Sequence, residues 1–172
     1  MKKISSTSTL HDDTPCGLFY STSAINSNLA SISSSFPRAA SHTIAMKANP
    51  IRAVLEIARD AGFGIEVASD VELQAAKILN FPRGRIVYDS PAKTLTSIRS
   101  ALECGAAINA DSLEEIDRIS DAREEVGLRG EGAADGGIIG VRVNPQIGGG
   151  GIWETSTVEK TSKLVYMHRS PL

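Results

Sequence analysis

The sequence predicts an α/β domain built around a mainly parallel sheet, with strands and helices alternating along the chain. From residue 42 onward, short runs rich in Ile and Val alternate with longer segments whose apolar residues recur at helical spacing. The apolar runs do not alternate regularly with polar residues, which is typical of parallel strands buried on both faces. Signals for the start of a helix stand between several of these runs. A βαβα order of this kind indicates a parallel sheet with helices packed on it.

Five strands are expected, and a helix follows each of the first four. The predicted strands are Thr43–Met46, Gly64–Ala68, Arg85–Tyr88, Ala106–Asn109 and Ile138–Val143. The helices are predicted from apolar stripes at Ile51, Val54, Leu55 and Ala58; at Val71, Ala75, Ile78 and Leu79; at Leu95, Ile98 and Leu102; and at Leu113, Ile116 and Ile119. A further amphipathic helix is expected at about residues 23–34, before the first strand.

Three helix starts are marked by their local sequence. They are Asn49-Pro50, an N-cap followed by proline at the first helical position, and the capping-box pairs Ser69 with Glu72 and Ser112 with Glu115. Each helix is expected to begin directly after its cap.

Length and charge exclude several functional classes. The chain has 172 residues, of which 41% are apolar, so one domain with a sizeable core is expected. Lys and Arg number 18 against 20 Asp and Glu, which does not fit the basic surface of a nucleic-acid-binding protein. No apolar run approaches the ~20 residues that cross a bilayer, so a soluble cytoplasmic protein is expected, with an organellar transit segment as the weaker alternative. Two cysteines and three widely separated histidines predict neither a disulfide framework nor a metal site.

Glycine is concentrated in the C-terminal part of the chain. Ten of the 15 glycines lie between Gly127 and Gly151. Residues 127–137 are expected to form a surface loop. The run Gly148–Gly151 is expected to be a mobile loop rather than a phosphate-binding loop, because no P-loop lysine follows it.

Polar residues stand where reactive groups collect in parallel α/β folds, at the carboxyl ends of strands. Lys47 follows the first predicted strand, and Glu66 lies in the second. Asn109 closes the fourth, and Arg142 lies near the end of the fifth. In a closed barrel these ends meet around one cavity, where a lysine could serve as a Schiff-base nucleophile. Plainer roles stay open: Lys47 as a surface charge, Glu66 and Arg142 as an ion pair, and Glu72 as a capping residue rather than a ligand.

Six strings of the sequence resemble those of a known family. They are AMKANP from Ala45, GFGIEVASDVEL from Gly62, RIVYDSPAK from Arg85, INADSLEEI from Ile108, GVRVNP from Gly140 and TSTVEKTSK from Thr155. In content and order they are similar to the alanine racemase-like (fold type III) pyridoxal phosphate decarboxylases, with the diaminopimelate decarboxylases as the nearest branch. The alanine after the lysine in AMKANP favours that branch over the ornithine branch. The resemblance covers about residues 15–163.

The resemblance implies a cofactor site. It implies that Lys47 holds pyridoxal 5'-phosphate, on which an amino-acid substrate would lose carbon dioxide. Glu66 matches a position where the family usually carries aspartate beside the cofactor. Arg142 matches an arginine that contacts the cofactor from the fifth strand. Lys163 matches a lysine near the subunit interface, although the two residues after it differ from the family's Phe-Gly.

The resemblance also implies a fold and a domain plan. It predicts a TIM-type (β/α)8 barrel of which about five βα units are present, without the family's C-terminal β domain. The expected division is a flexible segment at residues 1–14, the pyridoxal-binding barrel domain at 15–163, and a tail outside the family pattern at 164–172. An amino-acid substrate and a homodimer are implied as well.

The predicted function is therefore that of an amino-acid decarboxylase of lysine biosynthesis, in a truncated form with little activity of its own. Two alternatives stay open: a noncatalytic remnant that binds pyridoxal phosphate, and an ornithine- or arginine-type decarboxylase. A racemase of the same fold type is disfavoured by the strings from Ile108 and Thr155.

Overall fold

The strands of the chain form one sheet in sequence order, β1 to β6, in the computed structural model. The structure describes residues 17–128 and 137–143, together with the backbone of 164–167. Its elements are α1 (Thr22–Ser35), β1 (Thr43–Ala45), the 3-10 turn η1 (Met46–Ala48), α2 (Arg52–Asp60), β2 (Gly64–Val67), α3 (Asp70–Ile78), β3 (Ile86–Tyr88), α4 (Leu95–Glu103), β4 (Ala107–Ala110), α5 (Leu113–Glu125), β5 (Ile139–Val143) and β6 (Leu164–Met167).

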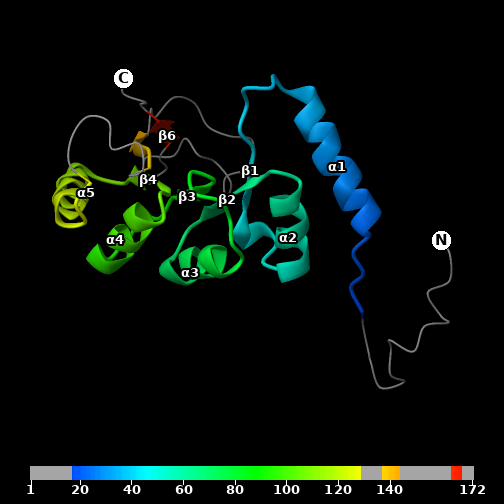
Figure 1. Cartoon of the computed structure of the whole chain (residues 1–172), viewed down its shortest axis with the longest axis horizontal. Coiled ribbons are helices and arrows are strands. Elements are labelled where there is room, and N and C mark those ends of the chain that lie inside the picture. The colour runs from blue at the N-terminus through cyan, green and yellow to red at the C-terminus, as the bar shows by residue number, and fades with distance from the viewer. Residues whose placement is uncertain (1–16, 129–136, 144–163, 168–172) are drawn as a thin grey trace, which may run out of the picture.

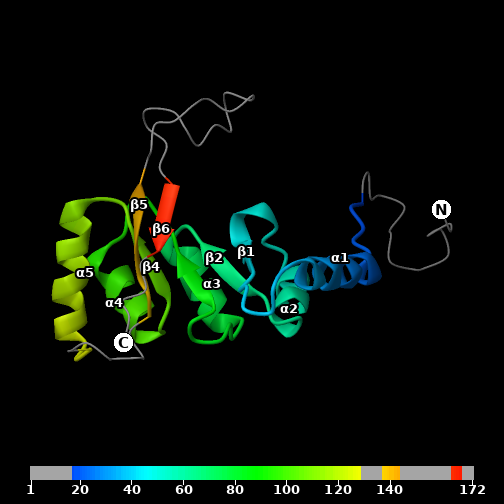
Figure 2. The same ribbon diagram turned by 90° about the horizontal axis from the view of Figure 1, so that it is seen from above.

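The first five strands are parallel, and each pairs with the next along the chain. Helices α2 to α5 lie in a row along one face of the sheet, and α1 lies beside α2 at the β1 end (Figures 1 and 2). The five predicted strands are confirmed, because each lies within one residue of its expected bounds. The alternation of parallel strands and covering helices is the α/β class that the sequence predicts.

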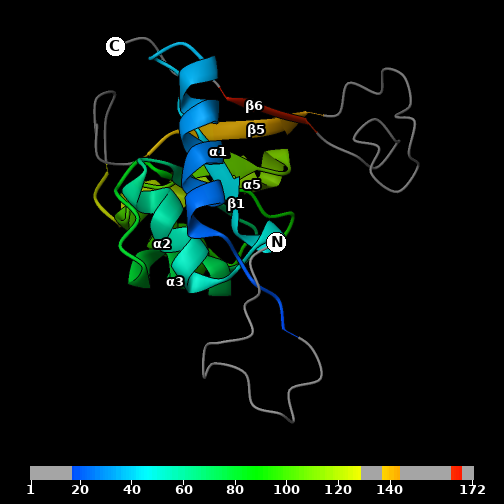
Figure 3. The same cartoon turned by 90° about the vertical axis from the view of Figure 1, so that its right-hand side faces the viewer.

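The sequence does not predict β6, which pairs antiparallel with β5. Figure 3 shows the two strands side by side. Strand β5 therefore has a neighbour on both sides, whereas β1 pairs with β2 alone among the described strands. Within this part of the chain the sheet does not close into a barrel.

One hydrophobic core lies between the sheet and helices α2 to α5. Its largest members are no more than 2% exposed, namely Leu55, Ile65, Val67, Leu73, Ile86, Tyr88, Ile98, Leu102, Ile108 and Ile119. Burying one such side chain contributes roughly 1.5–3 kcal/mol relative to leaving it exposed. A smaller cluster of Leu29, Ala58 and Phe63 attaches α1 to this body.

Helix α2 begins later than predicted. The N-cap of α2 is Ile51, not Asn49, because Met46–Ala48 form a 3-10 turn after β1. Asn49 Oδ1 instead accepts a hydrogen bond from the N–H of Ile51 at 3.2 Å. An asparagine side chain that bonds its own backbone two residues on closes a turn, and this turn replaces the expected first residues of the helix.

Two of the predicted apolar stripes lie partly on the wrong face. Val71 and Ile78 of α3 are 79% and 75% exposed, and Leu113 of α5 is 76% exposed. Helix α3 buries Leu73 and Ala76 instead. A helix of nine residues offers more than one apolar stripe at 3.6-residue spacing, and contact with the sheet decides which stripe is buried.

Several predicted features lie outside the described residues. They are the segment 1–14, most of the loop 127–137, the run Gly148–Gly151 and Lys163. The predicted domain division therefore stays a prediction. Among the helices that the structure describes, none is long and apolar enough to cross a membrane.

Candidate functional site

The strand register places three of the predicted residues on the face of the sheet that the helices do not cover. In β2 and β4 the residues on either side of Glu66 and Asn109 pack in the core beneath the helices. Successive side chains along a strand point to opposite faces, so Glu66 and Asn109 point away from the helices. Asn109 pairs with Gly140, and Arg142 lies two residues further along β5. Arg142 therefore shares this face, which is the interior face of a closed barrel.

Lys47 stands at the carboxyl end of β1. The turn η1 buries Met46 in the core and leaves the Lys47 side chain 64% exposed. Its Nζ lies 3.5 Å from Oε1 of Glu66 on the neighbouring strand β2. An exposed ion pair adds only ~0–1 kcal/mol to stability. The stability of the fold therefore does not explain why an amine and a carboxylate lie together at this end of the sheet.

Arg142 connects the ends of three strands. Its Nη1 donates a hydrogen bond to Asp111 Oδ1 at 3.0 Å, and its Nε lies 3.4 Å from Asp89 Oδ1. Asp89 directly follows β3 and Asp111 directly follows β4. The three side chains are between 17% and 21% exposed, so their charges are less screened than at the surface. The ion pair between Glu66 and Arg142 that the sequence allows is not formed, because each residue has another partner.

Three buried polar atoms at this end of the sheet have no hydrogen-bond partner among the described residues. They are Asp89 Oδ1, Asn109 Oδ1 and Arg142 Nε. Asp89 Oδ1 and Arg142 Nε face each other 3.4 Å apart as an ion pair. Buried polar groups nearly always have a partner, so Asn109 Oδ1 is the candidate for contact with a bound polar molecule. The positive charge of Arg142 fits the charged oxygens of the cofactor that the resemblance implies, and the Lys47 amine fits its aldehyde.

Glu72 acts as a helix cap. Ser69 Oγ accepts the N–H of Glu72 at 3.2 Å, as the capping box predicts. The Glu72 carboxylate reaches one residue further back than expected and accepts the N–H of Ala68 at 2.7 Å. Ser112 and Glu115 repeat this arrangement at the start of α5. The capping role of Glu72 is therefore observed, and its carboxylate is engaged with the backbone.

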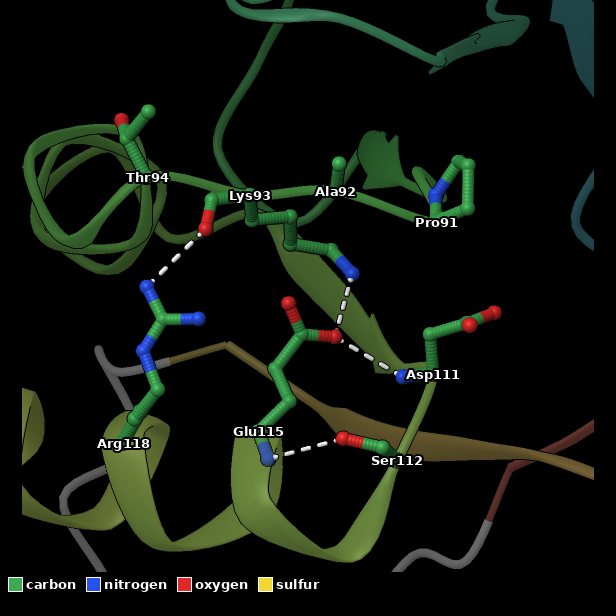
Figure 4. A pocket seen from close by; sticks show the side chains of 8 residues that line it. All are labelled: Pro91, Ala92, Lys93, Thr94, Asp111, Ser112, Glu115 and Arg118. Carbon is green, nitrogen blue, oxygen red and sulfur yellow. Dashed lines mark hydrogen bonds and ion pairs between the residues drawn. The ribbon is translucent and has the colours of Figure 1, made fainter.

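A cavity of about 360 Å³ lies beside the start of α5. Figure 4 shows Glu115 between the loop that carries Lys93 and the turn at Asp111. Lys93 Nζ and Glu115 Oε2 are 2.8 Å apart, with side chains 0% and 6% exposed. A buried ion pair therefore joins two loops at the carboxyl end of the sheet.

Tyr88 forms a second polar connection under the helices. Its hydroxyl donates to Asp70 Oδ1 at the start of α3 and lies 3.2 Å from Ser97 Oγ of α4. Burial and the bond to the Asp70 carboxylate raise the pKa of Tyr88 to about 12. Burial opposes ionisation of Asp70, but hydrogen bonds from Tyr88, Ser97 and Thr94 leave its pKa below the ordinary value.

Sequence reasoning missed Asp89, Asp111 and Lys93 as members of the site. Asp89 and Asp111 carry the same signal that selects Lys47, since each follows directly on a strand. Lys93 carries no such signal, because it lies four residues after Asp89 in a loop and its partners are distant in sequence.

Comparison with known proteins assigns the chain to a family. The family described as pyridoxal-dependent decarboxylase, pyridoxal binding domain, matches residues 22–164. The chain therefore belongs to the pyridoxal-dependent decarboxylases, a family that uses pyridoxal phosphate. The predicted family, fold class and cofactor are confirmed.

Relatives of the chain include proteins named as decarboxylases. The diaminopimelate decarboxylase of Methanothermobacter thermautotrophicus is 34% identical over 125 residues, which are 73% of this chain and 27% of the relative. The crystal structure of diaminopimelate decarboxylase from M. jannaschii is 26% identical, with a TM-score of 0.61 over 74% of this chain and 30% of that one. The diaminopimelate decarboxylase of Helicobacter pylori, complexed with L-lysine, has a TM-score of 0.68 over 83% of this chain and 35% of that one; at 23% identity it shows the shared fold. The matches span about a quarter of the length of curated relatives, 23% and 27% in two of them.

Proposed function

We propose that this chain forms the pyridoxal-binding part of a decarboxylase of meso-diaminopimelate, in which Lys47 holds the cofactor. The main observation in support is the position of Lys47 Nζ, which lies 3.5 Å from Glu66 Oε1 at the carboxyl end of the parallel sheet. Glu66, Asn109 and Arg142 share the helix-free face at this end. The relatives named as diaminopimelate decarboxylases support the choice of substrate.

Lys47 and Glu66 supply the reactive end of this site. Pyridoxal phosphate, when bound, supplies an electron sink for the electron pair left when an amino acid loses carbon dioxide. The exposed amine of Lys47 is free to approach an aldehyde group, and the Glu66 carboxylate accepts a hydrogen bond from it. Glutamate is one methylene longer than the aspartate typical of the family, so the carboxylate reaches the amine from β2.

Arg142 supplies a donor that is held in place. Asp111 accepts from Nη1 and Asp89 lies beside Nε, so the plane of the guanidinium is fixed. Arg142 Nε faces the Asp89 carboxylate at 3.4 Å, and the guanidinium carries the positive charge that would attract an anionic oxygen of the cofactor. Asn109 Oδ1 offers a buried acceptor on the same face.

The remaining parts of the proposal follow from the family resemblance. We expect a cytoplasmic homodimer. We also expect the 172-residue chain alone to take up the cofactor but to release little carbon dioxide, because its described strands leave the barrel open between β1 and β6.

Cofactor attachment is tested by chemical trapping. The chain is incubated with pyridoxal phosphate and reduced with borohydride, and the modified peptide is identified by mass spectrometry. We expect the label on Lys47, with Lys77→Ala as a matched control that keeps the label. Lys77 Nζ donates to Ser100 on the helix side of the sheet, so it lies away from the site. Label on Lys77 or Lys93, or undiminished labelling of Lys47→Ala, would contradict the assignment.

Substrate choice is tested separately with the loaded chain. Meso-diaminopimelate, ornithine, arginine and lysine are each added, and release of the cofactor from Lys47 is followed by visible absorption. We expect meso-diaminopimelate to release the cofactor from Lys47 at a lower concentration than the other three amino acids. A stronger response to ornithine or arginine would move the proposal to that branch and leave the role of Lys47 intact.

A further inference from the structure

The buried pair Lys93–Glu115 lies in the two segments that follow the carboxylates paired with Arg142. Lys93 belongs to the loop between β3 and α4, and Glu115 to the first turn of α5 (Figure 4). Lys93 follows Asp89 on one strand end, and Glu115 follows Asp111 on the next. The pair therefore connects the segments from which both carboxylates project.

Lys93 uses all three donors of its ammonium group. Besides Glu115 Oε2, it donates to the carbonyl oxygens of Ser90 and Asn109, each at 2.7 Å. Glu115 Oε2 also accepts the N–H of Asp111 at 2.8 Å. The pair thus fixes the residue after Asp89 and the backbone on both sides of Ala110.

A cavity adjoins the pair between the segment before α4 and the start of α5. The cavity of about 360 Å³ lies between them, with Pro91 and Thr94 on one side and Asp111 and Ser112 on the other. Figure 4 shows the Lys93 ammonium directed at the Glu115 carboxylate, 2.8 Å away. Directional hydrogen bonds from one buried charge join the two segments beside this cavity.

Stability is a poor explanation for such a pair. Replacing a buried ion pair by apolar residues of similar volume is often neutral or stabilising, because burying two charges removes their hydration. What apolar residues cannot supply is fixed contact with the carbonyls of Ser90 and Asn109 and with the N–H of Asp111.

We propose that Lys93 and Glu115 are positioning residues of the cofactor site. This inference rests on the proposed function, in which Arg142 contacts the cofactor. The pair fixes the position of the backbone next to Asp89 and at Asp111. The carboxylates of these two residues orient the guanidinium of Arg142, and Arg142 contacts the cofactor.

The test removes the pair without leaving a buried charge. The double variant Lys93→Met/Glu115→Leu keeps the approximate volume of both side chains. The matched control is Arg99→Met/Glu125→Leu, which removes an ion pair between α4 and α5 whose side chains are 38% and 52% exposed. In the chain without cofactor, the Arg142 Nε–H signal is followed by 15N NMR and assigned with Arg142→Met. Cofactor affinity and melting temperature are measured on the same proteins.

We expect the double variant to fold but to melt below the wild type, because the carbonyls of Ser90 and Asn109 and the N–H of Asp111 lose these hydrogen bonds. We also expect it to lose the slow exchange of the Arg142 Nε–H and to bind the cofactor about tenfold or more weakly, as is typical when partners that orient a binding group are removed. The control should keep both properties. An unchanged Arg142 signal, or unchanged affinity in a double variant that folds, would overturn the inference. If the wild type takes up no cofactor, the proposed function fails, while the Arg142 signal still decides whether the pair positions the guanidinium.

Discussion

Arg142 and Asp111 form the ion pair that ties β5 to the end of β4, with Arg142 Nη1 donating to Asp111 Oδ1 at 3.0 Å. The Arg142 Nε lies 3.4 Å from a second carboxylate, that of Asp89. Two carboxylates therefore hold one guanidinium. Replacing Arg142 removes the positive charge from both ion pairs. The effect of Arg142 on folding can therefore be separated from its effect on cofactor binding by neutralising these two carboxylates.

The first prediction concerns Arg142→Met. We expect cofactor affinity to fall by about 10- to 100-fold, in line with about 1.5–3 kcal/mol for a hydrogen bond to a charged group. The variant should also lose stability, because the partly buried carboxylates of Asp89 and Asp111 lose their ion pairs with Arg142. Adding Asp89→Asn and Asp111→Asn should restore the melting temperature and leave the affinity low. Recovery of affinity together with stability would mean that Arg142 serves only the fold.

The second prediction concerns the two faces of α3. Leu73→Ala is expected to cost about 3 kcal/mol in the free energy of unfolding, because Leu73 is 0% exposed and its removal leaves a cavity. Val71→Ala in the same helix should change stability by less than about 0.5 kcal/mol, since Val71 is 79% exposed. Denaturant titration measures both. Comparable losses would show that Val71 is covered in solution and that the stripe predicted from sequence is the buried one.

The sequence allowed the five parallel strands, two of the three capped helix starts and the position of Lys47 after a strand to be predicted, because these features depend on neighbours along the chain. Ser69 and Ser112 cap their helices as expected through bonds to residues three positions away. The rotation of α3 was not predictable, since its nine residues carry apolar side chains on more than one face. Only packing on the sheet selects Leu73 over Val71.

The partners of the site residues depended on register and could not be predicted. Glu66 meets Lys47 because β1 and β2 are aligned with Ala45 opposite Glu66. Asp111 meets Arg142 because Ala110 pairs with Val141. Glu115 was expected as a capping residue, and it does bond the backbone at the start of α5. Its second role, as the partner of Lys93, requires two loops to meet through the fold.

The third prediction concerns Gly64, where β2 passes close to its neighbours. A Cβ at this position would lie 2.4 Å from the backbone oxygen of Arg85 and 2.9 Å from Cγ2 of Thr43. Gly64→Ala is therefore expected to cost about 3 kcal/mol or more, the upper range for overpacking. Gly84→Ala is the control: its φ of +71° is strained for alanine, but nothing lies within 4 Å, so about 1 kcal/mol is expected. Equal losses in thermal unfolding would mean that β1 and β3 can move apart around residue 64.

The last prediction concerns the pH dependence that Tyr88 contributes to stability. Tyr88 is fully buried and donates to Asp70, and its pKa is raised from 10.0 to about 12. Between these values the unfolded chain releases the phenolic proton while the folded chain retains it, so unfolding is favoured as the pH rises. The contribution of Tyr88 is complete below about pH 10 and is lost progressively towards pH 12, with a total of up to about 3 kcal/mol. Tyr88→Phe removes the titrating group, and the difference in unfolding free energy between wild type and variant isolates it from other groups. We expect this difference to shrink from pH 9 to pH 12 as measured by urea unfolding; a difference that stays constant across that range would show that the Tyr88 hydroxyl ionises equally in both states and does not depend on Asp70.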